Sequence, residues 1–237
     1  MRLDGRRPEE PRPVKLECGF LCYAEGSCLA QAGNTKVLCA VSLERRVPRF
    51  LLGSGQGWVT AEYGLLPRST QERTPRETAG LRGRTHEIRR FIGRSLRAVC
   101  DLTALGECQL VVDCDVIQAD GGTRTLAVTG GFCALEQAVR HCLAQGTIQR
   151  NPIIEPVAGM SCGLVAGEVM ADLTYDEDAR ADTDMNVVFT ESGRLVEVQC
   201  TAERVPLSQE QFRQLLLCAE RGVQTPLAAL RSVMRPA

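Results

Sequence analysis

Histidine and lysine are scarce in this sequence. His86 and His141 are the only histidines, and Lys15 and Lys36 are the only lysines, so 26 of the 28 basic residues are arginine. No Cys-x-x-Cys spacing occurs among the 12 cysteines. Because zinc sites draw on closely spaced cysteine and histidine ligands, the sequence excludes such a site. Two histidines also leave no credible Ser-His-Asp or Cys-His arrangement for nucleophilic catalysis.

Long apolar runs are absent as well. No stretch reaches the roughly 18 consecutive apolar residues of a membrane span, and the N-terminal residues carry no apolar segment typical of a secretory signal. Of the 237 residues, 44% are apolar and 24% are charged, and the net charge is −1, which is typical of a globular chain. We therefore expect a cytoplasmic protein without a membrane partner, folded as a single domain over residues 1–237.

The 12 cysteines predict packing rather than disulfides. Cys39, Cys114, Cys142, Cys162 and Cys218 lie within apolar stretches, where a free cysteine behaves as a small buried hydrophobe. In the absence of a secretory signal, we expect free thiols in a reducing compartment.

Arginine is concentrated in one part of the chain. Between Arg68 and Arg97, nine arginines face only three glutamates, a local excess of six positive charges. A GC-rich genome accounts for arginine replacing lysine in general, but not for this concentration. Since the arginine fork binds phosphate in a bidentate manner, the stretch favours an anion-binding or RNA-binding surface over a merely solvated face.

The apolar periodicity predicts an α/β or α+β fold with two similar β-rich halves. We expect a basic, proline-rich arm over residues 1–13 and a long polar loop or arm over residues 67–84. The expected strands cover two or three segments within 14–43, then 58–66, 110–116, 157–171, 185–190 and 194–202, and the expected helices cover 88–99, 123–144 and a final one from about 208.

One strand-to-helix junction, Asp120-Gly121-Gly122-Thr123-Arg124-Thr125, has the composition of an anion site. Two glycines permit a tight turn that brings backbone amides close to an anion, and the helix start adds free N–H groups. The Gly-Lys-Ser/Thr of a Walker loop is missing, so inorganic phosphate suits this junction better than a triphosphate. An ordinary turn, with glycines for geometry alone, is the alternative.

Six carboxylates fall within the thirteen residues from Asp172 to Asp184. Hard oxygen ligands of this kind suit Mg²⁺, although their spacing does not match an EF-hand loop. A solvated acidic loop is the alternative. The metal interpretation gains weight beside a phosphate site, since phosphoryl transfer depends on positioning and on neutralising charge.

Six longer stretches are distinctive: Gly57–Thr70 (GWVTAEYGLLPRST), Gly83–Ile88 (GRTHEI), Ile92–Arg97 (IGRSLR), Val112–Thr125 (VDCDVIQADGGTRT), Asp182–Val188 (DTDMNVV) and Gln199–Glu203 (QCTAE). Together they resemble signature stretches of the bacterial ribonuclease PH family. The similarity covers nearly the whole chain, and stretches of this length are specific in combination.

This resemblance implies a ribosomal-protein-S5-domain-2-like sandwich and a phosphate-dependent 3′-to-5′ exoribonuclease. Such an enzyme trims the 3′ extension of tRNA precursors with phosphate instead of water, releases nucleoside diphosphates, and adds nucleotides to RNA 3′ ends in reverse. Matched by motif, Arg84 and Gly122-Thr123-Arg124 correspond to the family's phosphate-binding residues. Asp178 and Asp184 correspond to carboxylates with catalytic and metal-binding roles. The implied co-substrate is inorganic phosphate, and the implied cofactor is Mg²⁺.

The same resemblance places Arg68, Arg73 and Arg76 in an arm that joins dimers into a homohexamer, a trimer of dimers, and that lines the path of the RNA. The alternative within this fold is a non-catalytic RNA-binding ring subunit like those of exosomes. Such subunits typically lose the arginines or the carboxylates of the site. Because this sequence keeps both, it favours the enzyme.

Overall fold

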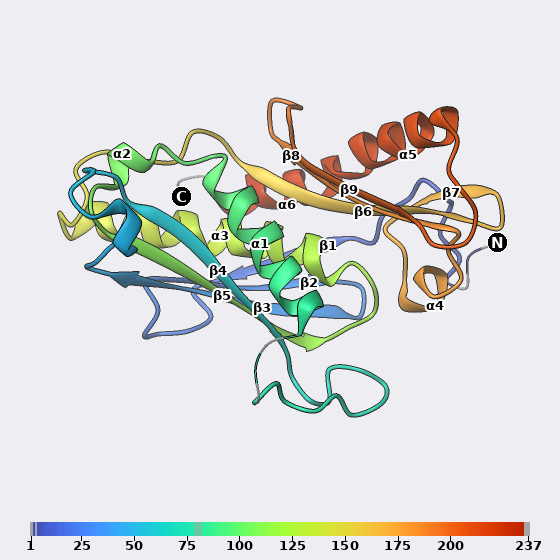
Figure 1. The fold of residues 1–237 in the computed structure, drawn as a ribbon, viewed down its shortest axis with the longest axis horizontal. Helices are drawn as coiled ribbons and strands as arrows, with labels where there is room; N and C mark the ends of the chain where they lie inside the picture. The colour runs from blue at the N-terminus through green and yellow to red at the C-terminus, as the bar shows by residue number, and fades with distance from the viewer. Residues whose placement is uncertain (1, 3, 79, 81, 235–237) are drawn as a thin grey trace.

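Two β-sheets and the helices around them make up the fold. The computed structural model describes residue 2, residues 4–78, residue 80 and residues 82–234. A five-stranded sheet has the order β1-β2-β3-β5-β4, and a four-stranded sheet has the order β7-β6-β8-β9. This arrangement confirms the expected mixed fold with two β-rich halves (Figure 1). In this described part of the chain, no helix has the length and apolarity that a membrane crossing requires.

The five-stranded sheet combines hairpins with one crossover. Its strands are β1 (Val14–Cys18), β2 (Gly26–Ala32), β3 (Thr35–Glu44), β4 (Trp58–Leu65) and β5 (Gln109–Gln118). β4 and β5 are parallel neighbours, and parallel strands need a long connection, which here contains α1 (Gly83–Arg97) and the short α2 (Leu102–Leu105). The carboxyl ends of β4 and β5 therefore meet at the same edge of the sheet.

Helix α3 (Thr123–Ala144) has the bounds that the sequence predicts. It packs against β2 and β3 of the first sheet and against β6 of the second. A helix that is apolar on all sides is buried on all sides, and most residues of α3 are buried. One continuous core consequently includes side chains from both sheets and from the helices, among them Leu110 of β5, Met185 of β8, Phe91 of α1 and Phe132 of α3.

The second half departs from the sequence prediction at two places. It contains β6 (Val157–Val165), β7 (Glu168–Ala171), α4 (Tyr175–Asp178), β8 (Thr183–Thr190), β9 (Leu195–Ala202), α5 (Gln209–Gly222) and α6 (Gln224–Met234). The expected strand 157–171 is two strands, because Ala166 and Gly167 form a tight turn with φ of 50° and 82°.

The expected last helix is also two helices, since Pro226 lies in the first turn of α6 and its nitrogen has no N–H to continue the hydrogen bonding of α5. The short α2, α4 and η1 (Arg49–Leu51) were not predicted, because segments of three or four residues show no periodicity.

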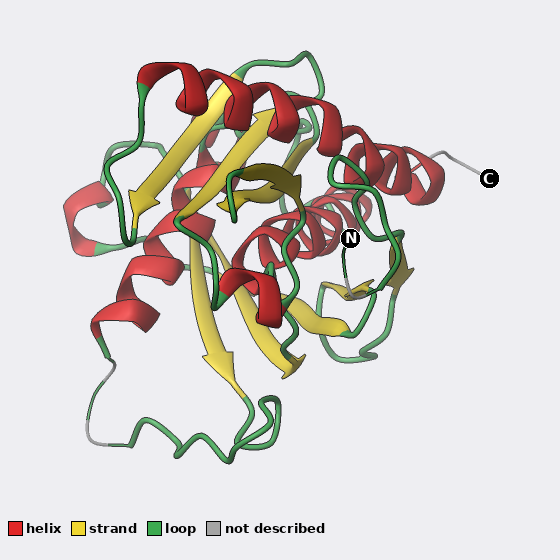
Figure 2. Cartoon of the chain, turned by 90° about the vertical axis from the view of Figure 1, so that its right-hand side faces the viewer, coloured by secondary structure: helices red, strands yellow, loops and turns green. Residues whose placement is uncertain are grey.

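The loop between β4 and α1 extends away from the rest of the protein (Figures 1 and 2). It corresponds to the polar segment expected over 67–84, except that α1 already begins at Gly83. The backbone N–H of Ala119 donates to the carbonyl oxygen of Ser69 at 2.8 Å, which ties the base of the loop to the end of β5. Residues 79 and 81 of this loop, and residues 1 and 3 of the expected N-terminal arm, lie outside the described residues.

Four cysteines form a row across the first sheet. Cys18 pairs with Cys28, Cys28 with Cys39, and Cys39 with Cys114, so four adjacent strands each contribute one thiol. Cys133 of α3 packs on this row, with its Sγ 3.2 Å from that of Cys18. All 12 cysteines are free, and burial raises the pKa of Cys18 to about 12. Eight of them are buried and act as small packing groups, as predicted for Cys39, Cys114, Cys142 and Cys162, whereas Cys218 is only partly buried and Cys18 and Cys22 are exposed.

Candidate active site

A pocket of about 640 Å³ lies where the two halves meet. Its walls come from the ends of β4 and β5, the starts of α1 and α3, α4, and β8. Six residues that the sequence singles out line it together: Arg84, Gly122, Thr123, Arg124, Asp178 and Asp184. The fold thus brings positive and negative side chains from distant parts of the chain into one cavity, while the chemical role of each stays a prediction.

Helix α3 starts at this pocket without a side-chain cap. Gly122 is its N-cap residue, with a φ of 65°, and no side chain of the described residues accepts a hydrogen bond from the first turn. The amides of that turn are therefore available to an anion at the positive end of a long helix. Gly121 permits close packing of this loop on the neighbouring segment, because a Cβ there would lie 2.1 Å from the carbonyl oxygen of Leu173.

Arg124 is held in place while part of its guanidinium stays free. Its Nη1 donates to Oε1 of Gln199 at 2.9 Å and to Oε1 of Glu87 at 3.2 Å, and its Nε and Nη2 have no hydrogen-bond partner among the described residues. Arg84, in the first turn of α1, is exposed and forms no ion pair within the described part of the chain. Two forks with free donors beside two helix starts fit an oxyanion such as phosphate.

The sequence does not single out two hydroxyl groups that the structure places in the pocket. The hydroxyl of Tyr63 lies 2.8 Å from Oγ1 of Thr123 and joins the end of β4 to the first turn of α3. Ser161 of β6 is 4% exposed, and its Oγ has no partner among the described residues. Because an unpaired buried hydroxyl is costly, Ser161 fits a donor to a bound anion. In the sequence, Ser161 is only one polar residue within an apolar strand, and such a residue does not by itself predict a binding role.

Asp178 and Asp184 form the acidic wall of the pocket. Burial raises the pKa of Asp178, and the charges of Arg84 and Arg124 oppose this effect. Burial, followed by the negative charge of Asp178, raises the pKa of Asp184 to about 6. Asn186 donates a hydrogen bond from Nδ2 to Oδ2 of Asp184 at 2.9 Å. Two neighbouring carboxylates that repel one another favour a cation between them.

The carboxylates present fit a Mg²⁺ ion that is shared with substrate. Within the described residues, no group of three or more His, Cys, Asp or Glu could hold a metal ion alone. Mg²⁺ commonly binds through one or two carboxylates, with water and substrate phosphate oxygens completing its octahedron. Asp178 and Asp184 supply that number of ligands, and the raised pKa of Asp184 marks a half-buried charge that a cation would neutralise.

Other carboxylates of the acidic run have different partners. Asp172 pairs with Arg12, and Glu177 pairs with Arg2, both from the N-terminal segment. These two carboxylates are therefore not available to a metal ion. Arginine side chains neutralise part of the run, and only the Asp178–Asp184 pair faces the pocket with Glu203 nearby.

The arginine-rich stretch also divides into two parts. On α1, Arg89 pairs with Glu62 and Arg94 pairs with Glu197, so these side chains connect elements of the fold. Arg97 donates from Nη1 to the carbonyl oxygen of Val59 at 2.7 Å. Interpreting the whole stretch as an anion-binding surface therefore fails for this part of the helix.

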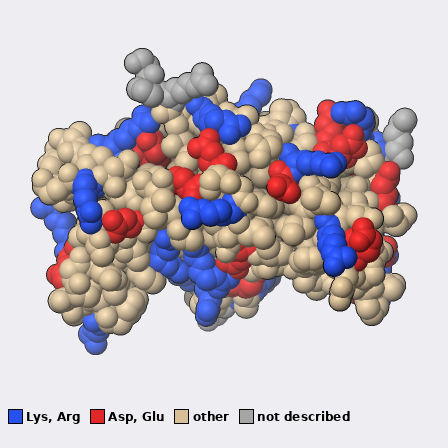
Figure 3. Space-filling model, turned by 90° about the horizontal axis from the view of Figure 1, so that it is seen from above, with Lys and Arg blue, Asp and Glu red and all other residues tan. Residues whose placement is uncertain are grey.

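The remaining part is the loop 66–82. Arg68, Arg73 and Arg76 lie on this loop, are exposed and do not line the pocket, whereas Thr70 of the same loop does. On the face of the protein shown in Figure 3, basic and acidic side chains are interspersed.

Known proteins similar to this chain identify its family. The ribonuclease PH of Corynebacterium kroppenstedtii is 50% identical over 236 residues, which cover 99% of this chain and 93% of that protein. The ribonuclease PH of Maricaulis maris is 52% identical over 237 residues, covering 98% of this chain and all 100% of that protein. Two family models, described as 3′ exoribonuclease family, domain 1 and domain 2, match residues 10–140 and 155–222. The chain belongs to the ribonuclease PH family of 3′ exoribonucleases.

Solved structures agree with the fold of this ribonuclease PH family member. The crystal structure of rice (Oryza sativa) Rrp46 superimposes with a TM-score of 0.80 at 20% identity, covering 99% of this chain and 100% of that one. A chain of the Archaeoglobus fulgidus exosome with RNA bound to the active site gives a TM-score of 0.81 at 19% identity, covering 99% and 92%. These likenesses confirm the expected sandwich fold.

Proposed function

We propose that this chain is a phosphorolytic 3′-to-5′ exoribonuclease that trims the 3′ extension of tRNA precursors and acts on other RNA 3′ ends. It releases nucleoside diphosphates, and the reverse reaction adds nucleotides to RNA. The observation that carries this proposal is the convergence of Arg84, Arg124 and the start of α3 with the Asp178–Asp184 pair in one pocket. The two relatives named ribonuclease PH support the same activity.

Inorganic phosphate is the attacking group in this proposal. The first-turn amides of α3, the forks of Arg84 and Arg124 and the hydroxyl of Ser161 bind it and direct one of its oxygens at the last internucleotide phosphorus. A new phosphorus–oxygen bond forms as the bond from that phosphorus to the preceding 3′ oxygen breaks. The proton carried by the phosphate ends on the 3′ oxygen. The guanidinium groups stabilise the negative charge of the transition state.

The acidic wall completes the site. When bound, Mg²⁺ neutralises negative charge on the oxygens of the transferred phosphoryl group. Asp178 and Asp184 would hold the ion, and Asn186 fixes the orientation of Asp184 through its hydrogen bond. Their carboxylates share the pocket with the arginines proposed to bind phosphate, whose charges act on both of them.

A homohexamer built as a trimer of dimers is part of the proposal. It is supported by the loop 66–82, which extends from the body of the protein with its arginines exposed. Long polar loops are uncommon in compact domains unless they have a function. We place the protein in the cytoplasm, which the 12 free thiols support because thiols persist in a reducing compartment.

The test is incubation of a tRNA carrying a 3′ extension with the protein and Mg²⁺, with and without inorganic phosphate. Nucleoside diphosphates that appear only with phosphate are the expected result. Nucleoside monophosphates would instead indicate a hydrolase. RNA binding without any product would favour the non-catalytic ring subunit.

A further inference from the structure

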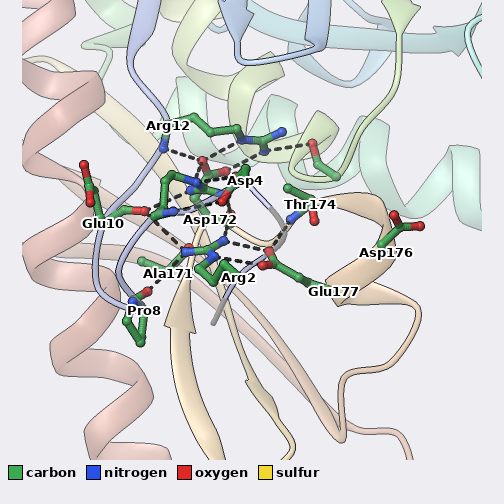
Figure 4. A network of polar contacts seen from close by, with 12 residues as sticks. Arg2, Asp4, Pro8, Glu10, Arg12, Ala171, Asp172, Thr174, Asp176 and Glu177 are labelled. Carbon is green, nitrogen blue, oxygen red and sulfur yellow. Dashed lines mark hydrogen bonds and ion pairs between the residues drawn. The ribbon is translucent and has the colours of Figure 1, made fainter.

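The N-terminal segment, residues 2 and 4–12, binds two elements that line the pocket (Figure 4). One is the phosphate loop, defined here as residues 120–122. The other is α4, which carries Asp178. Two buried arginines, one near each end of the segment, make these contacts.

Arg12 holds the phosphate loop. Its Nη1 donates to the carbonyl oxygen of Asp120 at 2.6 Å, and its Nη2 donates to that of Gly121 at 3.4 Å. The guanidinium is itself fixed by Asp172, to which Nε and Nη2 donate at 2.8 and 2.7 Å. Thr35 adds a second support, because its hydroxyl donates to the same Gly121 oxygen at 2.7 Å. The backbone immediately before the α3 N-cap is therefore held from one side by side chains of β3 and the N-terminal segment.

Arg2 holds α4. Its Nε and Nη2 donate to the two carboxylate oxygens of Glu177 at 2.8 and 2.7 Å, and the two side chains are 1% and 6% exposed. Glu177 also accepts the backbone N–H of Thr174 at 2.9 Å, which closes the capping box of this one-turn helix. Asp178 follows Glu177 directly, so the Arg2–Glu177 pair fixes the turn from which Asp178 enters the pocket.

Asp172 connects the two contacts. Its carboxylate binds Arg12, while its backbone carbonyl accepts a hydrogen bond from Nη2 of Arg2 at 2.8 Å. The residue has a φ of 52°, a conformation that is uncommon outside glycine and persists where surrounding contacts impose it. The side chain and backbone of this residue thereby join the support of the phosphate loop to the support of α4.

We propose that the N-terminal segment is a positioning brace that sets the phosphate-binding wall and the carboxylate wall of the pocket relative to one another. Arg12 acts through the phosphate loop, and Arg2 acts through Glu177. Every N–H group of both guanidiniums already has an acceptor, so neither contacts substrate. The inference rests on the proposed function in that it assigns phosphate to one wall and Mg²⁺ to the other.

Two mild variants separate the walls. Thr35→Val removes the hydroxyl that donates to the Gly121 oxygen and accepts N–H groups of Asp120 and Arg12, all within the support of the phosphate loop. Glu177→Gln keeps the size of the side chain but weakens its pairing with Arg2. We expect Thr35→Val to raise the KM for inorganic phosphate about tenfold with little change in kcat, and to leave the Mg²⁺ requirement unchanged. We expect Glu177→Gln to raise the required Mg²⁺ concentration by a similar factor and to leave the KM for phosphate unchanged. Arg7→Ala, an exposed arginine of the same segment, is the control for both.

Calorimetric titration with inorganic phosphate, and with Mg²⁺ in the presence of phosphate, measures both affinities without turnover. Positioning predicts that Thr35→Val weakens only the phosphate affinity and that Glu177→Gln weakens only the Mg²⁺ affinity. General loss of structure would weaken both affinities together. Equal effects of each variant on both ligands, or affinities within twofold of the wild type, would overturn the brace. If the wild type binds phosphate but releases no diphosphates, the proposed function fails while the titrations still decide the brace.

Arg12→Gln leaves a buried carboxylate unpaired, so it is examined as a double variant with Asp172→Asn. The fold of the double variant is checked by circular dichroism before titration. We expect a weakened phosphate affinity in this variant, and an unchanged affinity in a folded double variant would also overturn the brace.

Discussion

Asp178 lies close to Asp184, and its negative charge adds to the effect of burial on that neighbour. Together they raise the pKa of Asp184 to about 6. The ordinary pKa of an aspartate is 3.8. A carboxyl group with a raised pKa costs stability when it is ionised in the folded protein. That cost is present above about pH 6 and disappears as the pH falls through the folded value toward the unfolded one.

Asp184→Asn is therefore expected to stabilise the Mg²⁺-free protein at pH 8. The free energy of unfolding should rise by about 1 kcal/mol or more at that pH, and the difference should shrink below pH 5. Urea unfolding in EDTA at both pH values measures it. The exposed Asp176→Asn on α4 serves as the control and should change little. A variant less stable than the wild type at pH 8 would contradict the assigned cause.

Arg124→Ala is expected to lower kcat/KM for phosphorolysis by about 10²- to 10³-fold, because it removes a fork that stabilises the transition state. The side chain pairs only at its Nη1, so the variant should fold. Arg140→Ala, on the same helix but outside the pocket, is the matched control. Phosphate-dependent release of diphosphates from a labelled RNA measures the effect, and wild-type turnover in Arg124→Ala would remove it from the site.

Replacing Arg68, Arg73 and Arg76 together with alanine is expected to shift the native mass from hexamer to dimer. These exposed side chains lie on a loop that extends from the body of the protein, where a neighbouring copy would meet them. Light scattering after size exclusion gives the mass. A triple variant at Arg7, Arg46 and Arg213, which are similarly exposed, controls for loss of charge alone. A hexamer that persists in the loop variant, or one that is lost equally from the control variant, would refute the assignment.

Gly121→Ala is expected to destabilise the protein more than Gly167→Ala. Both glycines have a positive φ, so both variants carry the left-handed strain of about 1–2 kcal/mol. Only at Gly121 would the new Cβ also collide with backbone, 2.1 Å from the Leu173 oxygen, whereas nothing lies within 4 Å at Gly167. The difference in free energy of unfolding should reach about 2 kcal/mol. Equal denaturation midpoints would show that the loop and the segment before α4 separate at little cost.

The sequence predicts elements well where the pattern is long. The helix over 123–144 matches α3 because its apolar character and its glycine-rich start are both strong signals. The sequence prediction fails at two short breaks, although glycine or proline lies at each. Only Ala166 and Gly167 separate β6 from β7, and only Val223, in a helical conformation, separates α5 from α6, so the apolar pattern continues across both.

The site, too, is predicted only in part from the sequence. Motifs carried by the resemblance supply six residues that the fold brings to one pocket, but a linear pattern does not show which neighbours share a face. Glu177 and Asp178 are adjacent, yet successive residues of a helix point in different directions, so one binds Arg2 and the other enters the pocket. Tyr63 and Thr123 meet only through the parallel pairing of β4 with β5, a relationship that no spacing in the sequence expresses.

Arg12 and Asp172 are separated by 160 positions in the chain. During synthesis at about 5–20 residues per second, the first would wait about 8–32 s for the second to be made. Until Asp172 is made, Arg12 lacks the carboxylate that fixes its guanidinium against the phosphate loop. The pocket is consequently assembled late in translation, so the nascent chain has no complete nuclease site while it is surrounded by the RNA of the ribosome that makes it.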